Sequence, residues 1–254
     1  MHRTVVGAVA ATVLTLFVFL ALDLRTGRAL TRSPGPDALT IEVIGHQWWW
    51  EVHYPDSVPQ QNVTTANEIH VPVGRPVVFE VTSRDVIHSF WAPNLNGKKD
   101  LIPGYQRSLW FKADTPGVYR GQCAEFCGHE HAKMAFFVVA EPPERFAAWL
   151  DAQRRPAPQP SDSIAHRGLQ VFLASSCVMC HAVHGTPAGA TLGPDLTHLA
   201  SRRTIAAGTL PNTRGNLAGW IVDPQRIKPG VSMPPNELHP QDLQALLTYL
   251  QSLK

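Results

Sequence analysis

Residues 123–134 read CAEFCGHEHAKM and bring four metal-binding side chains into one short segment. Cys123 and Cys127 are four residues apart, His131 follows after four more, and Met134 after a further three. Thiolate, imidazole and thioether groups are ligands of zinc, copper and other transition metals. The segment therefore predicts a metal centre, and its spacing is the starting point for the rest of the chain.

The donor set admits more than one metal. His88, in the segment DVIHSFW, offers a fourth ligand, and two thiolates with two imidazoles would form a closed tetrahedral zinc site. Zinc has no use for Met134, whose thioether is a soft ligand of the kind found weakly bound at electron-transfer copper sites. One copper of that type uses a single cysteine. Two cysteines, two histidines and one methionine suit two coppers bridged by both sulfurs, with a backbone carbonyl at the remaining axial position.

The chain around this segment has the pattern of a small β-sandwich or barrel. Short runs rich in Val, Ile, Phe and Trp alternate with turn signals from Leu39 to Ala140. The runs include IEVIGHQWWWEVHY, EIHVPVGRPVVFEV and MAFFVVA, and the turns include PNLNGK and DTPGVY. The sequence therefore predicts an all-β domain over residues 38–140.

The character of the chain changes after this domain. Phe146, Trp149 and Leu150 lie at helical spacing, and RRPAPQPSDS then alternates proline with polar residues, as a semi-rigid extended linker does. Residues 141–162 are therefore predicted to form a short helix and a linker.

A helical domain is predicted over residues 163–254. IAHRGLQVFLASS opens it and LHPQDLQALLTYLQSL closes it, both with apolar residues at helical spacing. The middle is rich in Gly and Pro and is expected to contain little regular structure. A domain of this size with two main helices is short of core, so a bound group is expected to fill it.

That group is predicted from the segment Cys177-Val-Met-Cys180-His181, which reads as a covalent attachment site for c-type haem. The spacing sets two thiols opposite the two vinyl groups of a porphyrin, and His181 brings an imidazole under the iron. A zinc or redox CxxC would need further thiols or a thioredoxin-like setting. The chain has four cysteines, all in two close pairs, whereas a disulfide framework usually joins distant segments.

The sixth ligand of the iron is expected from farther along the chain. The candidates are His184, His198, Met233 and His239. Met233 is favoured because it lies in KPGVSMPP, a loop stiffened by proline and without the apolar periodicity of a core segment. Histidine with methionine raises the reduction potential and suits electron transfer rather than ligand binding.

The stretch from Val5 to Leu22 carries no charge over 18 residues. As a helix it would be about 27 Å long, close to the roughly 30 Å hydrocarbon core of a bilayer. It is longer than the usual apolar region of a signal peptide, and no small-x-small cleavage motif follows it. Residues 1–30 are therefore predicted to be a retained membrane anchor rather than a cleaved leader.

The charges that flank this stretch bear on the orientation of the anchor in the membrane. Arg3 precedes it, whereas Arg25, Arg28 and Arg32 follow it, and that count alone would keep the body of the protein in the cytoplasm.

Composition excludes two broad classes. With 44% hydrophobic and 17% charged residues, the chain is expected to fold rather than to be disordered. A formal net charge of +2 and the lack of a basic run argue against a nucleic-acid partner.

With these motifs in place, the first domain resembles subunit II of cytochrome c oxidase, which carries the binuclear copper centre CuA. GHQWWWEVHY at 45–54, DVIHSFWAPNL at 85–95, KKDLIPG at 98–104 and the segment 123–134 all match that family's pattern. The resemblance implies a cupredoxin-like Greek-key barrel.

The resemblance also implies the copper ligands. Two cysteines bridge the metals, one copper takes a histidine and the methionine, and the other takes a histidine and a backbone carbonyl. In this chain the bridging cysteines are Cys123 and Cys127. His88 and Met134 are the ligands of one copper, and His131 with the carbonyl of Glu125 are the ligands of the other.

Two further roles follow from the resemblance, and two features depart from it. Trp48 matches the tryptophan at which electrons enter, the alternative being an aromatic residue of the barrel, and Glu125 resembles the carboxylate that shares a magnesium site with subunit I. The family has two transmembrane helices before the copper domain and one is predicted here, so the chain is a short-anchored variant or its true start lies upstream. PGY at 103–105 replaces the family's common PGR, so Tyr105 stands in place of an arginine. Any contact that the family makes through that arginine is therefore in doubt.

The region from Ile164 to Lys254 resembles a class I cytochrome c. The matching residues lie on the first helix, at the CVMCH and GPDL motifs, in the methionine loop and on the last helix: Gly168, Phe172, 177–181, 193–196, Met233 and Tyr249. The resemblance implies that Pro194 offers its carbonyl to the His181 ring and that Trp220 reaches a haem propionate.

Together the two resemblances imply the subunit through which electrons enter a terminal haem-copper oxidase. It would relay electrons from a donor through haem c and CuA to the haem of subunit I, where oxygen is reduced to water. The implied partners are subunit I, subunit III and a donor such as a cytochrome c or a bc-type complex. The family assembles both cofactors outside the cytoplasm in bacteria, which places both domains on the outer face of the inner membrane.

Three alternatives were weighed against this interpretation. The corresponding subunit of a nitric oxide reductase with the same copper centre differs in its terminal acceptor, which this chain does not contain. A copper-delivery protein would bind one copper through CxxxC and histidine, and would need neither haem nor Met134. A nitrous oxide reductase needs a large additional histidine-rich domain, which 254 residues cannot hold.

Overall fold

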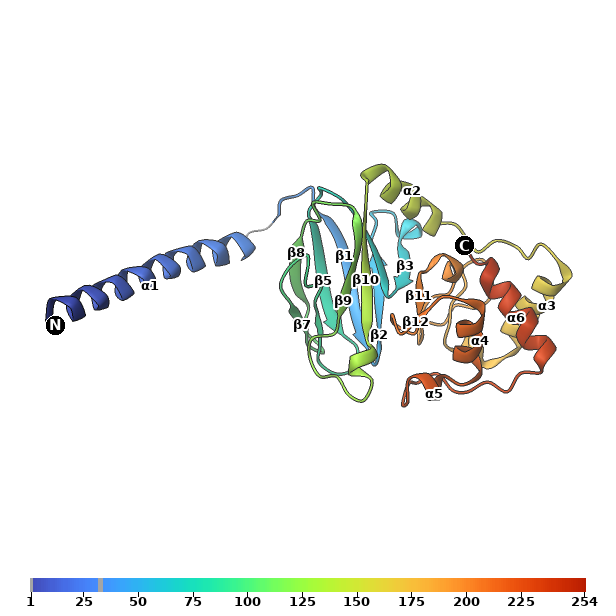
Figure 1. The fold of residues 1–254 in the computed structure, drawn as a ribbon. Helices are drawn as coiled ribbons and strands as arrows, with labels where there is room; N and C mark the ends of the chain where they lie inside the picture. Colours follow the sequence, from blue (N-terminus) through green and yellow to red (C-terminus); the bar gives the residue numbers. More distant parts are fainter. Residues whose placement is uncertain (1, 32–33) are drawn as a thin grey trace. The chain divides into compact units, whose positions relative to one another are not determined.

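The computed structural model describes residues 2–31 and 34–254, which divide into two compact units after Pro36. The first unit contains the helix α1 (His2–Thr31), which confirms the predicted N-terminal helix (Figure 1). Arg32, counted above among the charges after this helix, and residue 1 of the predicted anchor lie outside the described residues.

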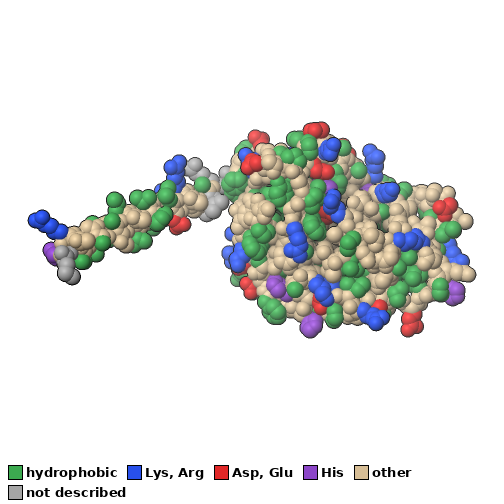
Figure 2. Space-filling view, in the orientation of Figure 1, with side chains coloured by type: hydrophobic (Ala, Val, Ile, Leu, Met, Phe, Trp, Pro, Cys, Tyr) green, Lys and Arg blue, Asp and Glu red, His purple; other side chains and the backbone are tan. Residues whose placement is uncertain are grey.

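Within the described ranges, α1 is the one helix long and apolar enough, by length and composition, to cross a membrane, over His2–Ala29. Figure 2 shows hydrophobic side chains along its middle and charged side chains toward its ends. The hydroxyls of Thr12, Thr15 and Thr26 each donate to the carbonyl four residues earlier, at 2.9–3.0 Å. Their polar groups are therefore satisfied inside the helix, as an apolar environment requires.

The second unit begins with ten strands, which confirm the predicted all-β domain. They are β1 (Leu39–His46), β2 (Trp49–Tyr54), β3 (Val63–Ala66), β4 (Glu68–Pro72), β5 (Val77–Ser83), β6 (His88–Phe90), β7 (Lys99–Leu101), β8 (Arg107–Phe111), β9 (Gly117–Gln122) and β10 (Ala135–Glu141). Five strands form a sheet in the order β3-β2-β1-β5-β8, three form a second sheet in the order β4-β10-β9, and β6 pairs with β7. The pairs β1–β5 and β4–β10 are parallel and the others antiparallel.

Alternation along the strands creates the core of this domain. In β5 every second residue is buried, as expected for a strand with one face on a core. Aromatic rings fill the centre: Trp50 packs edge-on against Phe136 at 5.2 Å between centroids, and Phe136 stacks on Phe90 at 4.3 Å. A Cβ at Gly121 would lie 2.1 Å from the Phe136 ring, so glycine at this position allows the ring to occupy the core.

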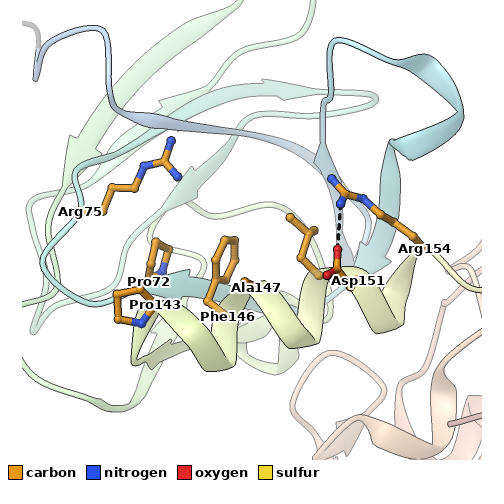
Figure 3. A pocket seen from close by; sticks show the side chains of 8 residues that line it. Pro72, Arg75, Pro143, Phe146, Ala147, Asp151 and Arg154 are labelled. Atoms are coloured by element: carbon orange, nitrogen blue, oxygen red, sulfur yellow. Dashed lines mark hydrogen bonds and ion pairs between the residues drawn. The ribbon is translucent and has the colours of Figure 1, made fainter.

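The helix α2 (Pro143–Gln153) closes one end of the barrel, where the sequence predicts a helix. Trp149 stacks on His70 at 4.1 Å between centroids and packs edge-on against Tyr54 at 5.2 Å. A groove of about 330 Å³ runs beside this helix, and the pair of Arg154 with Asp151 lies at its edge (Figure 3).

The C-terminal part is helical, which confirms the predicted class. It contains α3 (Ser163–Ala174), α4 (Arg214–Val222), α5 (Pro224–Ile227), α6 (Pro240–Ser252) and the short pair β11 (Thr204–Ile205) and β12 (Leu210–Pro211). Helices α3 and α6 cross at Gly168, where a Cβ would lie 2.1 Å from the Ala245 carbonyl oxygen. This close crossing explains the glycine in the first helix.

The middle of this domain is more regular than the sequence predicts. Thr213 caps α4 by accepting from the Asn216 amide, and Leu217 and Ile221, four residues apart, are buried. The expectation of little regular structure was wrong at this helix, because only two of its apolar residues are buried and the others follow one another without clear helical spacing.

Glu51 on β2 is a nearly buried carboxylate held by two histidines. Its oxygens lie 2.8 Å from His46 Nε2 and 2.8 Å from His53 Nε2. Burial raises the pKa of Glu51, but the hydrogen bonds and charges of these histidines outweigh burial and bring the pKa down from 4.5 to about 2. Because the folded-state pKa is depressed, this carboxylate contributes stability above about pH 4.5, and that contribution is lost as the pH falls toward 2.

We expect Glu51→Gln to lower the free energy of unfolding by about 1–3 kcal/mol at pH 7, since it breaks a buried charged network. The difference from the wild type should shrink between pH 4.5 and pH 3. Urea titrations followed by tryptophan fluorescence at these pH values measure it, with the exposed Glu144→Gln as the matched control. An equal loss at pH 3 and pH 7 would contradict the pairing.

Candidate metal centres

The start of β6 and the loop between β9 and β10 bring together three ligands of the predicted copper site. Cys123 Sγ lies 3.8 Å from Cys127 Sγ and 3.9 Å from His88 Nδ1. The ligand atoms of these three residues all lie within 4.8 Å of one another, and all three residues are buried. Residues separated by up to 39 positions in the chain thus form one pocket of sulfur and nitrogen donors.

The other predicted ligands lie against the same two sulfurs. Cys127 Sγ is 3.5 Å from His131 Nδ1 and 3.8 Å from Met134 Sδ, and Cys123 Sγ is 3.3 Å from the Glu125 carbonyl oxygen. Glu125 itself is exposed. All six predicted donors therefore meet at one place.

Backbone hydrogen bonds fix the ligand loop at both ends. The Cys123 amide donates to the Met134 carbonyl at 3.0 Å, and the Ala124 amide donates to the Ser89 carbonyl at 3.0 Å. Within the loop, Gly128 has φ +112°, and a Cβ there would lie 2.9 Å from Gln47 Nε2. Glycine lets the loop turn while the Gln47 side chain reaches the neighbouring carbonyl.

Two polar residues that the sequence analysis does not single out orient the cluster. Asp85 Oδ1 lies 2.8 Å from His88 Nε2, which leaves Nδ1 facing the sulfurs. Gln47 Nε2 donates to the Cys127 carbonyl at 2.7 Å. A carboxylate on the far nitrogen of a metal-ligating histidine commonly fixes its tautomer, so Asp85, three residues before His88, was recognisable from spacing alone.

The electrostatics favour metal binding. A hydrogen bond from Cys127 lowers the pKa of Cys123, assisted by His88, and the same bond raises the pKa of Cys127. Burial lowers the pKa of His88, but its bonds to Asp85 and Cys123 raise it overall. These contacts favour the deprotonated form of Cys123, and a thiolate is the form that binds a metal.

The donor chemistry fits a pair of coppers better than zinc. A tetrahedral zinc site would be complete with two cysteines and two histidines, yet Met134 is fully buried with its sulfur against Cys127. A buried thioether beside two thiolates and two imidazoles is a soft set with one ligand more than zinc requires.

The second candidate centre is a cavity of about 460 Å³ lined mainly by the helical domain and, on one side, by barrel residues that include Trp48 and Trp49. The residues predicted to attach and ligate a haem all line it: Cys177, Cys180, His181 and Met233. The described residues around the cavity include Pro194 and Trp220 as well, but not His184, His198 or His239. His198 instead points its Nε2 at the carbonyls of Gln153 and Arg155.

Local contacts hold both axial candidates in this cavity. His181 Nδ1 lies 2.7 Å from the Pro194 carbonyl, the contact that the resemblance implies. A Cβ at Gly193 would lie 2.8 Å from His181 Cε1, so glycine there admits the ring. Burial lowers the pKa of His181, which keeps the imidazole neutral as an iron ligand must be. Gln225 Nε2 donates to the Met233 carbonyl at 2.9 Å and steadies the methionine loop.

A buried polar atom supports the fit of a haem to this cavity. Arg202 lines the cavity, and its Nε is buried without a hydrogen-bond partner among the described residues. Burial lowers the pKa of Arg202, which indicates that its guanidinium lacks a full set of compensating charges. A haem propionate would supply the missing anion, and no motif in the sequence marks Arg202 for this place.

Trp48 contacts both candidate centres. Its Nε1 donates to the Cys127 carbonyl at 2.9 Å, and its ring lines the haem cavity. Trp48 also belongs to the buried core of the barrel, together with the fully buried Trp50. It therefore packs as a barrel aromatic and at the same time contacts both candidate sites.

The chain is similar to known proteins in both of its domains. Residues 39–141 match the family model of the periplasmic domain of cytochrome c oxidase subunit II, and residues 165–254 match that of cytochrome c. Cytochrome c oxidase subunit 2 of Alkalihalophilus pseudofirmus is 40% identical over 246 residues, which cover 94% of this chain and 70% of the relative. That of Bacillus subtilis is 31% identical over 86% of this chain, which spans 63% of the relative's length.

Among solved structures, the periplasmic domain of subunit II of cytochrome oxidase from Bradyrhizobium japonicum is 33% identical to the matched part. The match covers 48% of this chain and 97% of that one, with a TM-score of 0.45.

We expect Cys127→Ser to abolish the bridged copper pair, because an oxygen cannot replace a shared soft thiolate. Met134→Leu should retain both coppers and change their reduction potential, because weak axial ligands tune a site more than they hold it. Copper content, the copper absorption spectrum and a redox titration distinguish the two variants. An unchanged copper spectrum in Cys127→Ser would rule out bridging by this sulfur.

Proposed function

The chain belongs to the cytochrome c oxidase subunit II family, and we propose that it is the subunit through which electrons enter a haem-copper oxidase. In this proposal it relays electrons from a donor through haem c and CuA to the haem of subunit I, where oxygen is reduced to water. One observation carries the proposal: two complete ligand sets lie in one compact unit, and Trp48 contacts both.

When bound, the haem and the copper pair supply two sites that each gain and lose a single electron. The residues of the chain hold them at fixed places. Cys177 and Cys180 would attach the haem covalently, His181 and Met233 would ligate its iron, and Arg202 would bind a propionate. Trp220, which lines the same cavity, is a second candidate for that propionate.

The loop residues would hold the copper pair with little movement. Cys123 and Cys127 lie at the centre of the donors, and backbone hydrogen bonds to Met134 and Ser89 fix the loop ends. A site whose ligands are already in place needs little rearrangement when its charge changes, and this favours electron transfer. The four terminal donors are His88, His131, Met134 and the Glu125 carbonyl.

Trp48 provides a short and dry connection between the two sites. The ring forms part of the haem cavity wall, and one hydrogen bond of 2.9 Å joins Nε1 to the carbonyl of a bridging cysteine. The residue is 8% exposed, so water is largely excluded from this connection. We assign Trp48 as the residue at which electrons reach the copper site.

The proposed partners are subunits I and III of the oxidase and a donor such as a cytochrome c or a bc-type complex. The exposed Glu125 would share a magnesium ion with subunit I. The helix α1 would anchor the chain in the bacterial inner membrane, with the two metal-binding domains on the outer face.

The full chain, produced with haem-attachment machinery but without a catalytic subunit and purified in detergent, should contain two coppers and one covalent haem. Metal analysis and a pyridine haemochrome spectrum measure these ratios. One copper per chain, or stoichiometric zinc in cells supplied with copper, would contradict the proposal. Purification with its native catalytic subunit then decides between an oxygen-reducing and a nitric oxide-reducing complex.

We expect Met233→His to keep the haem attached, since two thioethers hold it, and to lower its reduction potential by several steps of about 59 mV, each a tenfold change in equilibrium. Uptake from a high-potential donor should fall, while electrons delivered directly to the copper site should still reach subunit I. Redox titration measures the potential, and Met179→Leu, at an exposed residue inside the haem motif, is the matched control. A wild-type potential in Met233→His would show that another residue is the ligand.

A further inference from the structure

The copper ligand Met134 is flanked by two residues that the helical domain holds. On one side, the Lys133 carbonyl accepts hydrogen bonds from Lys228 Nζ at 2.9 Å and from Thr209 Oγ1 at 3.4 Å. On the other side, the Ala135 amide donates to the Ala207 carbonyl at 3.0 Å. The segment that carries the axial sulfur is therefore bonded to the helical domain immediately before and immediately after that residue.

Two lysines make this connection reciprocal. Lys133 Nζ donates to the Ile227 carbonyl at 2.6 Å, and Lys228 Nζ donates back to the Lys133 carbonyl. Lys228 Nζ also donates to the carbonyls of Trp48 at 2.7 Å and Ala206 at 3.4 Å. We call Lys133 and Lys228 with these acceptors the lysine clasp.

The burial of Lys228 shows that this is not an incidental surface contact. The residue is 1% exposed, and burial lowers the pKa of its ammonium to about 7. Its three possible donors match three carbonyl acceptors, two from the barrel and one from the helical domain. Removing the side chain would take its bond from the Trp48 carbonyl, which is costly at a buried site, whereas the carbonyls of Lys133 and Ala206 would keep their bonds to Thr209 Oγ1.

The segment opposite Ala135 is held in an unusual backbone conformation. Ala206 and Ala207 both have φ +54°, and Gly208 follows at φ +75°. Left-handed geometry costs an alanine about 1–2 kcal/mol, so the surrounding contacts must hold these residues in place. A Cβ at Gly208 would lie 2.9 Å from the Ala135 Cβ, which shows how closely this strap, residues 206–209, approaches the ligand segment.

Other contacts between the domains lie away from the metal loop. The Arg203 amide donates to Glu68 Oε2 at 3.1 Å, and Arg202 contacts Thr65 Oγ1 at 3.4 Å. These contacts join β3 and β4 to the helical domain. The clasp and the strap differ because they converge on Lys133, Ala135 and the Trp48 carbonyl.

We propose that the helical domain is a structural part of the copper centre, with Lys228 as a positioning residue that fixes Met134 and Trp48 through the lysine clasp. The clasp itself rests on contacts within the chain, whereas its effect on copper rests on the proposed function. The geometry and potential of the copper pair then depend on the haem-binding domain, which the resemblance to subunit II alone does not imply.

The test compares Lys228→Met with Arg226→Met in the full chain in detergent. Arg226 is exposed and lies two residues away, so it is a matched control for loss of a basic side chain. The first readout is hydrogen exchange of residues 131–137 in the copper-free, haem-bearing chain. We expect exchange at Ala135 to be at least tenfold faster in Lys228→Met and unchanged in Arg226→Met.

The second readout is the electron paramagnetic resonance spectrum and reduction potential of the copper-loaded chain. We expect Lys228→Met to keep both coppers and to change both quantities in the same direction as Met134→Leu, but by less. Lys133→Met, at a partly exposed residue that gives up the bond to Ile227 and the ion pair with Glu130 but leaves the Lys133 carbonyl in place, is a second variant if Lys228→Met does not fold. It should produce a smaller change of the same kind.

The outcomes separate this inference from the proposed function. A wild-type chain without a two-copper spectrum would overturn the proposed function, and the effect on copper with it. A normal wild-type spectrum with both lysine variants unchanged in exchange and in spectrum would overturn the clasp alone. Faster exchange with an unchanged copper spectrum would also overturn the inference, because the clasp would then join the domains without positioning the ligand.

Discussion

The two candidate centres depend on the hydrogen bonds that converge on the Cys127 carbonyl. Gln47 Nε2 and Trp48 Nε1 donate to this oxygen at 2.7 Å and 2.9 Å. The ligand loop has little regular structure, so contacts of this kind, and not a sheet or helix ladder, give it one shape. Because the same tryptophan forms part of the haem cavity wall, the position of the copper loop and the shape of the second site are set by one side chain.

The features that the sequence predicts are those carried by local spacing. Alternating apolar residues predict the strands, and the intervals between Cys123, Cys127, His131 and Met134 predict a cluster, because a short loop keeps such residues close. The CxxCH segment predicts the haem site for the same reason. His88 is predicted although it is distant in the chain, because its surrounding motif marks it.

The features that the sequence does not predict depend on contacts between distant segments. Lys228, which precedes Pro229 in KPGVSMPP, gives no local signal of burial, yet it bonds to carbonyls up to 180 positions away. Arg202 gives no local signal for its place in the haem cavity. No periodicity encodes such pairings, since the acceptors are backbone atoms that any residue would supply.

The linker shows why the two domains behave as one unit. Its proline pattern is typical of a semi-rigid spacer. A linker that acted only as a flexible tether would keep the domains near each other but would leave each one free to move. Here Arg154 pairs with Asp56 on the barrel at 2.8 Å, whereas the Ala157 amide donates to the His184 carbonyl of the helical domain at 2.9 Å. The linker is therefore tied to the barrel at Arg154 and to the helical domain already at Ala157. A buried lysine and a strained strap would be costly in an interface that opens often, since each opening would have to rebuild them. Their presence beside Trp48 would keep the two sites at a constant separation, which the proposed electron transfer between them would require.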